Sequence, residues 1–142
     1  MTEDFLKVTF ENAYAGVNPK ELSPLVLAYI GDAVYEMLAR TYVISQGNAP
    51  VDKMNAKARR IVSASGQNEM YFKLKDCLAD EEEAVFRRGR NANSHTHSKN
   101  ASVSEYRHAT GLEALFGYLY LSGNNERIME LFGFLYQDKT WI

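Results

Sequence analysis

Apolar residues recur at every third or fourth position along most of the chain, a spacing that is typical of helices with one buried face. The first such stretch covers about residues 24–45, where a capping serine followed by proline favours a helix start. The Gly, Asn and Pro residues of 47–50 end this helix. Two further helices are predicted over about residues 51–64 and 66–75.

In the second half of the chain, the helical pattern continues around one long polar interruption. Asp80, with Glu83 three residues later, predicts a fourth helix that begins there and ends at about Arg88. Residues 89–101 have no apolar period and are rich in Asn and Ser, so we expect a long loop.

A capping box marks the start of the next helix. Residues 102–105 (SVSE) have the serine and glutamate that cap each other's backbone, and this helix is predicted to continue to about Gly123. A last helix carries four apolar residues on one face: Ile128, Leu131, Phe132 and Leu135. Because no stretch alternates as a strand does, the predicted fold class is all-α, a single domain over residues 1–142 with about six to seven packed helices.

Composition narrows the class of protein further. A net charge of -2 excludes a uniformly basic nucleic-acid coat, and a single cysteine, Cys77, excludes a disulfide framework or a cysteine-built zinc site. The acidic start of the chain and the absence of a long apolar run predict neither a secretory signal nor a membrane span. We therefore expect a soluble, cytoplasmic protein.

Charge is unevenly distributed along the chain. Residues 1–36 hold two lysines against six acids, whereas residues 87–107 hold five basic side chains against Glu105 alone. Such a division suits a metal-binding centre beside a polyanion track, but chance clustering on a solvated surface explains it equally well.

Two acids, Asp32 and Glu113, lie in the middle of apolar helical stretches. A carboxylate in such a place is costly unless it is paired or bound to a metal. One interpretation is pairing with an arginine such as Arg40 or Arg107. The other is a shared Mg²⁺ or Mn²⁺ site, since carboxylate oxygens suit these ions and Gly117, one turn after Glu113, leaves room for another backbone or an ion.

Other candidate residues carry weaker signals. His95 and His97 lie in a polar loop without an obvious third ligand, so solvation or stacking on a nucleotide is favoured over metal binding. His108 is either a packing residue or a functional one. Cys77 has no activating base beside it in the sequence and is expected to be an inert, semi-buried thiol.

The two acidic segments resemble the signature helices of the ribonuclease III endonuclease domain. Residues 27–34 (LAYIGDAV) are similar to the second half of that family's first signature, and residues 109–117 (ATGLEALFG) are similar to its second acidic helix. The resemblance covers about residues 22–123. The segment 86–92 (FRRGRNA), and a chain that ends at Ile142 with no double-stranded-RNA-binding domain, are similar to the Mini-III subgroup.

This resemblance implies a ribonuclease III-like helical fold and a homodimeric endoribonuclease, a hydrolase that depends on Mg²⁺, with Mn²⁺ as a substitute, and cleaves double-stranded RNA. The subgroup implies maturation of the 23S ribosomal RNA precursor in bacteria. A ribosomal protein that presents the substrate is a further candidate partner. By position, Asp32 and Glu113 are the expected catalytic residues and metal ligands.

Two acids of the family pattern are absent, because Leu25 and Thr110 stand in their places. Glu36, one turn after Asp32, either supplies some of the lost charge or pairs with Arg40.

Recognition of A-form RNA depends mostly on its shape and backbone, so the expected contacts are basic and polar side chains. The candidates are Arg87, Arg88, Arg90, Asn91 and Lys99. A second basic set in residues 53–60 is either a contact surface or a solvated face. The dimer seam is expected on helix 24–45 at Leu25, Tyr29 and Met37, although core positions for the first two are an alternative.

Two rival functions remain open on the sequence alone. One is a non-catalytic RNA- or ribosome-binding module that keeps the fold without the full acidic set. The other is a helical protein-interaction domain without an RNA role.

Overall fold

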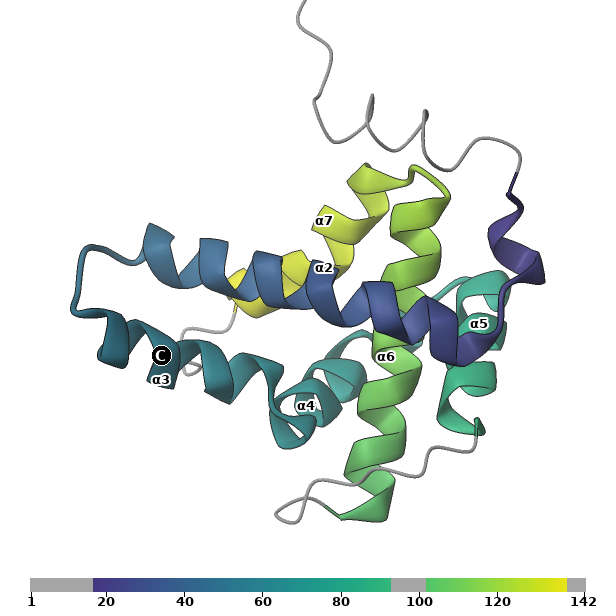
Figure 1. Cartoon of the computed structure of the whole chain (residues 1–142), viewed down its shortest axis with the longest axis horizontal. Helices are drawn as coiled ribbons and strands as arrows, with labels where there is room; N and C mark the ends of the chain where they lie inside the picture. The colour runs from purple at the N-terminus through teal and green to yellow at the C-terminus, as the bar shows by residue number, and fades with distance from the viewer. Residues whose placement is uncertain (1–16, 93–101, 138–142) are drawn as a thin grey trace, which may run out of the picture.

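The computed structural model describes residues 17–92 and 102–137, which form helices joined by short connections (Figure 1). In chain order these elements are the 3-10 helix η1 (Pro19–Glu21), α2 (Pro24–Ser45), α3 (Val51–Val62), α4 (Ala64–Leu74), the 3-10 helix η2 (Lys75–Cys77), α5 (Asp80–Arg90), α6 (Val103–Leu121) and α7 (Asn125–Gln137). The described residues include no strand, which confirms the predicted all-α class.

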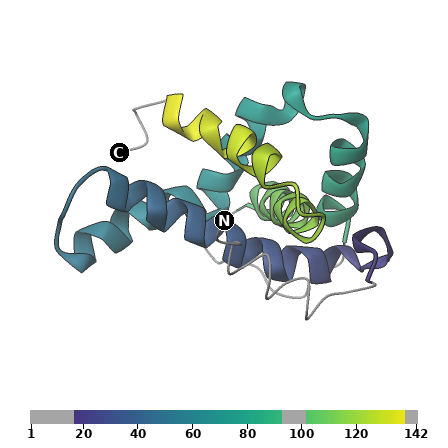
Figure 2. The ribbon, with the colours of Figure 1, turned by 90° about the horizontal axis from the view of Figure 1, so that it is seen from above.

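The helix α6 is the centre of the fold. Every residue from Ala109 to Leu119 is buried except Glu113, which is only partly covered, so this helix is enclosed nearly all round. Figure 2 looks nearly along α6 and shows the other helices arranged around it. The four apolar residues predicted to face the core from α7 are all buried.

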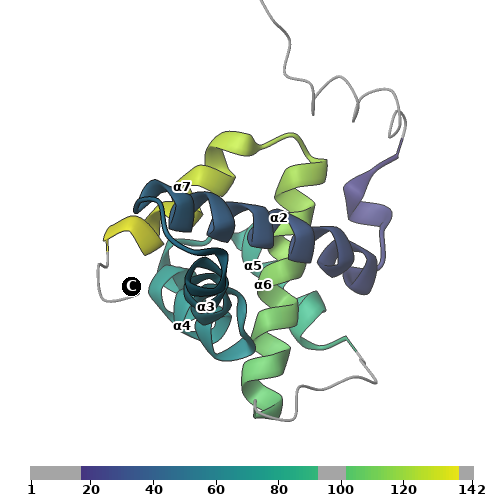
Figure 3. The same ribbon diagram turned by 60° about the vertical axis from the view of Figure 1, so that its left-hand side comes forward.

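The crossing of α2 over α6, visible in Figures 1 and 3, is a direct contact between two backbones. A Cβ atom at Gly31 would lie 1.6 Å from the carbonyl oxygen of Glu113. A Cβ atom at Gly117 would lie 1.9 Å from the carbonyl oxygen of Leu27. Only glycine fits either position, and the resulting close approach brings Asp32, the neighbour of Gly31, to the side of Glu113.

A second close crossing corrects the predicted end of the fourth helix. That helix, α5, continues through Gly89 to Arg90 rather than ending at Arg88. A Cβ at Gly89 would lie 2.7 Å from the Cβ of Ala114, so this glycine packs α5 tightly against α6 instead of breaking the helix. The rest of the expected loop, residues 93–101, lies outside the described residues.

The start of α5 is also one residue away from the prediction. The capping position is Ala79 rather than Asp80, and its backbone N–H donates to the Glu82 carboxylate at 2.8 Å. Glu82 is buried, and its carboxylate also accepts from Arg127 of α7, with Nε to Oε2 at 2.7 Å. The same carboxylate therefore joins α5 to α7 and caps the start of α5, and it belongs to Glu82 rather than to the predicted Glu83.

The predicted starts of α2, α3 and α6 are confirmed, whereas α4 begins at Ala64, two residues before the predicted start, because Ser63 caps it. The Ser23 hydroxyl accepts from the backbone N–H of Leu25 and Val26, and the Ser102–Glu105 capping box has both of its hydrogen bonds. The two shorter helices end at Val62 and Leu74, a residue or two before the expected positions. Within 17–92 and 102–137, no helix is long and apolar enough to cross a membrane.

Candidate active site

The carboxyl groups of Asp32 and Glu113 are within hydrogen-bonding distance of each other, although 81 residues separate them in the sequence. Asp32 is exposed on α2, which corrects the expectation that both acids are embedded in apolar surroundings. Glu113 of α6 is mostly covered. The pair therefore has one carboxylate open to solvent and one that forms the floor beneath it.

The surroundings of Glu113 favour its protonated form. Burial, together with the hydrogen bond and the negative charge of Asp32, raises the pKa of Glu113 to about 8. A hydrogen bond from the Gln67 amide acts in the opposite direction, because it favours the ionised form.

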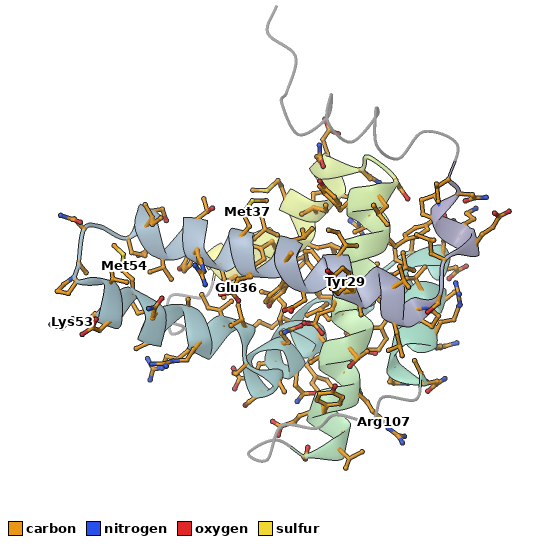
Figure 4. The ribbon with its side chains drawn as sticks, viewed as in Figure 1. Tyr29, Glu36, Met37, Lys53, Met54 and Arg107 are labelled. Atoms are coloured by element: carbon orange, nitrogen blue, oxygen red, sulfur yellow. The ribbon has the colours of Figure 1, made fainter. Side chains whose placement is uncertain are left out.

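Neither acid is neutralised by an arginine in the way the first interpretation suggested. Among the described residues, no ion pair includes Asp32 or Glu113. Arg40 instead pairs with Glu36 on its own helix, Nε to Oε1 at 3.0 Å, so that alternative for Glu36 is the one found. Arg107, the other arginine considered as a partner, is exposed near the start of α6. In Figure 4 it lies well away from Glu36 and so from the Glu36–Arg40 pair.

Two buried side chains around Glu113 were missed by sequence reasoning. Gln67 of α4 donates from Nε2 to the carbonyl oxygen of Val62 at 2.9 Å and also bonds the Glu113 carboxylate. Tyr35 of α2 is buried close enough that the charge of Glu113, after burial itself, raises its pKa. A signal for Gln67 was available, since it occupies the apolar stripe that continues at Met70 and Leu74.

The donor set fits a small divalent cation. Asp32 and Glu113 supply carboxylate oxygens, and the buried Gln67 Oε1 has no hydrogen-bond partner within the described parts of the chain. Those parts contain no cluster of three or more His, Cys, Asp or Glu side chains. Mg²⁺ is commonly held by one or two carboxylates while it keeps several waters, so two adjacent carboxylates are sufficient for it.

The residues that stand in place of the two absent family acids, Leu25 and Thr110, carry no charge. Thr110 is buried, and its hydroxyl donates to the Tyr106 carbonyl at 3.1 Å. Leu25 lies at the exposed start of α2.

The candidate RNA contacts lie on the last turn of α5 and just after it. The Arg87 guanidinium lies 3.2 Å from the Glu83 carboxylate, and Arg90 Nε donates to Asn91 Oδ1 at 3.2 Å. Arg88 is directed elsewhere, because its Nη2 donates to the Leu22 carbonyl at 3.2 Å. Lys99 lies outside the described residues.

Of the weaker candidates, the structure describes His108 and Cys77. His108 packs edge-on or tilted among the rings of Tyr71, Phe72 and Phe86 and shares a hydrogen bond with Asn68, so its packing role is the one found. The expectation for Cys77 is wrong as to burial, because the thiol lies in the short η2 element and is exposed. His95 and His97 lie outside the described residues.

This helical fold, with two carboxylates joined at a helix crossing, defines the nuclease class that the sequence resembles. Residues 25–124 match the Ribonuclease III domain family. The chain is 48% identical over 113 residues to a Mini-ribonuclease 3 of Clostridium tetani, covering 79% of this chain and 75% of that protein. It is 47% identical over 110 residues to the Mini-ribonuclease 3 of a Thermoanaerobacter species, covering 78% of each.

A solved structure shares the fold. The crystal structure of protein FN1578 from Fusobacterium nucleatum superposes with a TM-score of 0.75 at 29% identity, covering 83% of this chain and 94% of that one. The chain belongs to the ribonuclease III family, and within it to the Mini-ribonuclease 3 group. It is accordingly an endoribonuclease with RNA as its substrate, which excludes the two non-catalytic alternatives.

Proposed function

We propose that this endoribonuclease cleaves double-stranded RNA by metal-dependent phosphodiester hydrolysis, with Asp32 and Glu113 as its catalytic metal ligands. The observation that carries the proposal is the Gly31–Gly117 crossing, which holds two carboxylates together without an arginine to neutralise them among the described residues. A shared divalent cation is the partner that best offsets this concentration of negative charge.

The two acids have different roles, because Asp32 is exposed and Glu113 is mostly buried. Bound Mg²⁺ or Mn²⁺ would lower the pKa of a water molecule and offset charge on the phosphate oxygens. Asp32 is open to solvent, so its carboxylate can both hold the cation and accept a hydrogen bond from the attacking water. Glu113 is mostly buried, so its contribution is a fixed oxygen ligand.

Binding of the RNA duplex is assigned to the basic end of α5. Arg87 and Arg88 are exposed and Arg90 is partly exposed, so their guanidinium groups can contact phosphates in addition to their present partners. Asn91 adds a side-chain amide at the same end, and Lys99 follows in the sequence. Contacts of this kind recognise the backbone of A-form RNA rather than its bases.

Cleavage of both strands calls for two catalytic centres, which a symmetric dimer supplies. The face of α2 that points away from the core carries apolar side chains that are exposed to solvent in a single copy of the chain. Tyr29 is 83% exposed and Met37 is 49% exposed. Both residues are labelled on this helix in Figure 4. Leu25, Val26 and Ile44 extend the exposed apolar stripe along the helix, and we assign it to the contact with a second copy.

The proposed natural substrate is the precursor of 23S ribosomal RNA, and a ribosomal protein that presents the cleavage site is a proposed partner. The support is the similarity to Mini-ribonuclease 3 proteins over most of the chain. Such a substrate would place the protein's work in the bacterial cytoplasm.

The test is to incubate the purified protein with long duplex RNA, single-stranded RNA of the same sequence and a 23S precursor fragment, each in Mg²⁺ or in EDTA. We expect fragmentation of the duplex and of the precursor in Mg²⁺ alone. Equal cleavage in EDTA would contradict the metal-dependent mechanism, and preferential cleavage of single strands would contradict the substrate class.

A further inference from the structure

Gln67 is a buried polar side chain for which the proposed chemistry so far provides no function. It is 3% exposed, its Nε2 donates to the Val62 carbonyl at 2.9 Å, and its amide also bonds the Glu113 carboxylate. Its oxygen, Oε1, is equally buried and has no hydrogen-bond partner in the described part of the chain. Unpaired buried polar atoms are rare in folded proteins and are often found where a function requires them.

The backbone that carries Gln67 is fixed on two sides. The Ser63 hydroxyl accepts from the Gly66 N–H at 3.1 Å, and a Cβ at Gly66 would lie 2.0 Å from a carbonyl oxygen of α3, so the corner between α3 and α4 is tightly packed. On the other side, Asn68 shares a hydrogen bond with His108 of α6. The Gln67 amide therefore stands on a rigid support beside α6.

We propose that Gln67 is a positioning residue of the metal centre, which fixes the Glu113 carboxylate beside Asp32 for binding a small divalent cation. A glutamate side chain has three rotatable bonds, and the hydrogen bond from Gln67 restricts the last of them. Oε1 of the same amide is buried without a hydrogen-bond partner among the described residues, so it is a neutral oxygen available beside Glu113. This inference rests on the proposed metal-dependent function.

A purely structural role would have a different outcome. If Gln67 only satisfied the Val62 carbonyl at the end of α3, its loss would change stability and leave the cation affinity of the folded protein unchanged. The experiment must therefore measure cation binding directly, apart from activity.

The variant Gln67→Met removes the amide and keeps nearly the same length and volume. The matched control is Tyr35→Phe, which removes another buried polar atom near Glu113, a hydroxyl without a hydrogen-bond partner among the described residues. Binding of Mn²⁺ alone is measured from the electron paramagnetic resonance signal of the free ion, with Mg²⁺ as competitor and circular dichroism as the check on folding. Loss of a residue that orients a metal ligand typically weakens metal binding by about 10–100-fold.

We expect Gln67→Met to weaken Mn²⁺ binding at least about tenfold and Tyr35→Phe to leave it unchanged. Gln67→Asn keeps an amide that is one methylene too short to reach both partners, and it carries the same expected loss if Gln67→Met does not fold. Equal Mn²⁺ affinity in the wild type and a folded Gln67 variant would overturn this inference alone. If the wild type bound no Mn²⁺, the metal centre itself would be refuted and this inference with it.

Discussion

The substitution Glu113→Gln should make the metal-free protein more stable at neutral and alkaline pH. Burial and the neighbouring Asp32 raise the pKa of Glu113 from 4.5 to about 8. Between those values the folded protein retains a proton that the unfolded chain has released, so the free energy of unfolding falls as the pH rises through this window. Glutamine has the same shape, does not ionise and removes this loss.

The size of the effect follows from the same shift. At about 1.4 kcal/mol for each pKa unit, ionisation linkage costs the wild-type protein up to roughly 3 kcal/mol at pH 7 relative to pH 4. For a chain of this length, that free energy corresponds to a rise in melting temperature of about 6–10 °C in the variant.

The assay is thermal unfolding followed by circular dichroism in EDTA, from pH 4 to pH 9. The wild-type and Glu113→Gln curves should converge near pH 4 and separate toward pH 9, while the control Glu69→Gln, an exposed position on α4, should follow the wild type. Added Mg²⁺ should stabilise the wild type and have little effect on Glu113→Gln. A variant that tracks the wild-type melting temperature at every pH would refute the reasoning about this buried acid.

Three further predictions test the fold, the RNA contacts and the dimer. In chemical denaturation, Gly117→Ala should lower the free energy of unfolding by about 3 kcal/mol or more, because its Cβ would meet the Leu27 carbonyl. The control Gly133→Ala has no atom within 4 Å of its Cβ and should be neutral or stabilising. Replacing Arg87, Arg88 and Arg90 together with alanine should weaken binding about equally for unrelated duplexes and reduce the salt slope by roughly one unit for each lost phosphate contact; an unchanged slope would remove this end of α5 from the interface. Tyr29→Glu with Met37→Glu should convert a dimer into a monomer in light scattering, and a wild-type protein that is already monomeric while cutting both strands would contradict the dimer.

The sequence predicted the helices because most of them have one continuous apolar stripe, and it predicted the pair of acids because each lies in the middle of an apolar helical stretch. The room expected beside Gly117 is filled by the backbone of α2. Local signals were less reliable where contacts between helices decide the outcome. Glycine disfavours helices, so Gly89 was expected in the loop. Its close contact with Ala114 keeps it within α5.

Other features depend on a third helix that the two acidic motifs do not include. Gln67 reaches Glu113 only because α4 docks on α6, where Asn68 meets His108, and no spacing within one helix encodes that contact. The exposure of Asp32 has a similar origin, since α6 covers only one side of α2 at the crossing. An apolar neighbourhood in the sequence is therefore not the same as burial.

Single-turnover cleavage of duplex RNA by Asp32→Asn tests the central claim most directly. Asparagine keeps the shape of the exposed carboxylate and removes its charge, so folding and duplex binding should match the wild type. Cleavage in Mg²⁺ should fall by several orders of magnitude, because Glu113 would be the only acid left to hold the ion. A folded, RNA-binding Asp32→Asn protein that cuts at close to the wild-type rate would contradict the assignment of this carboxylate pair as the catalytic centre.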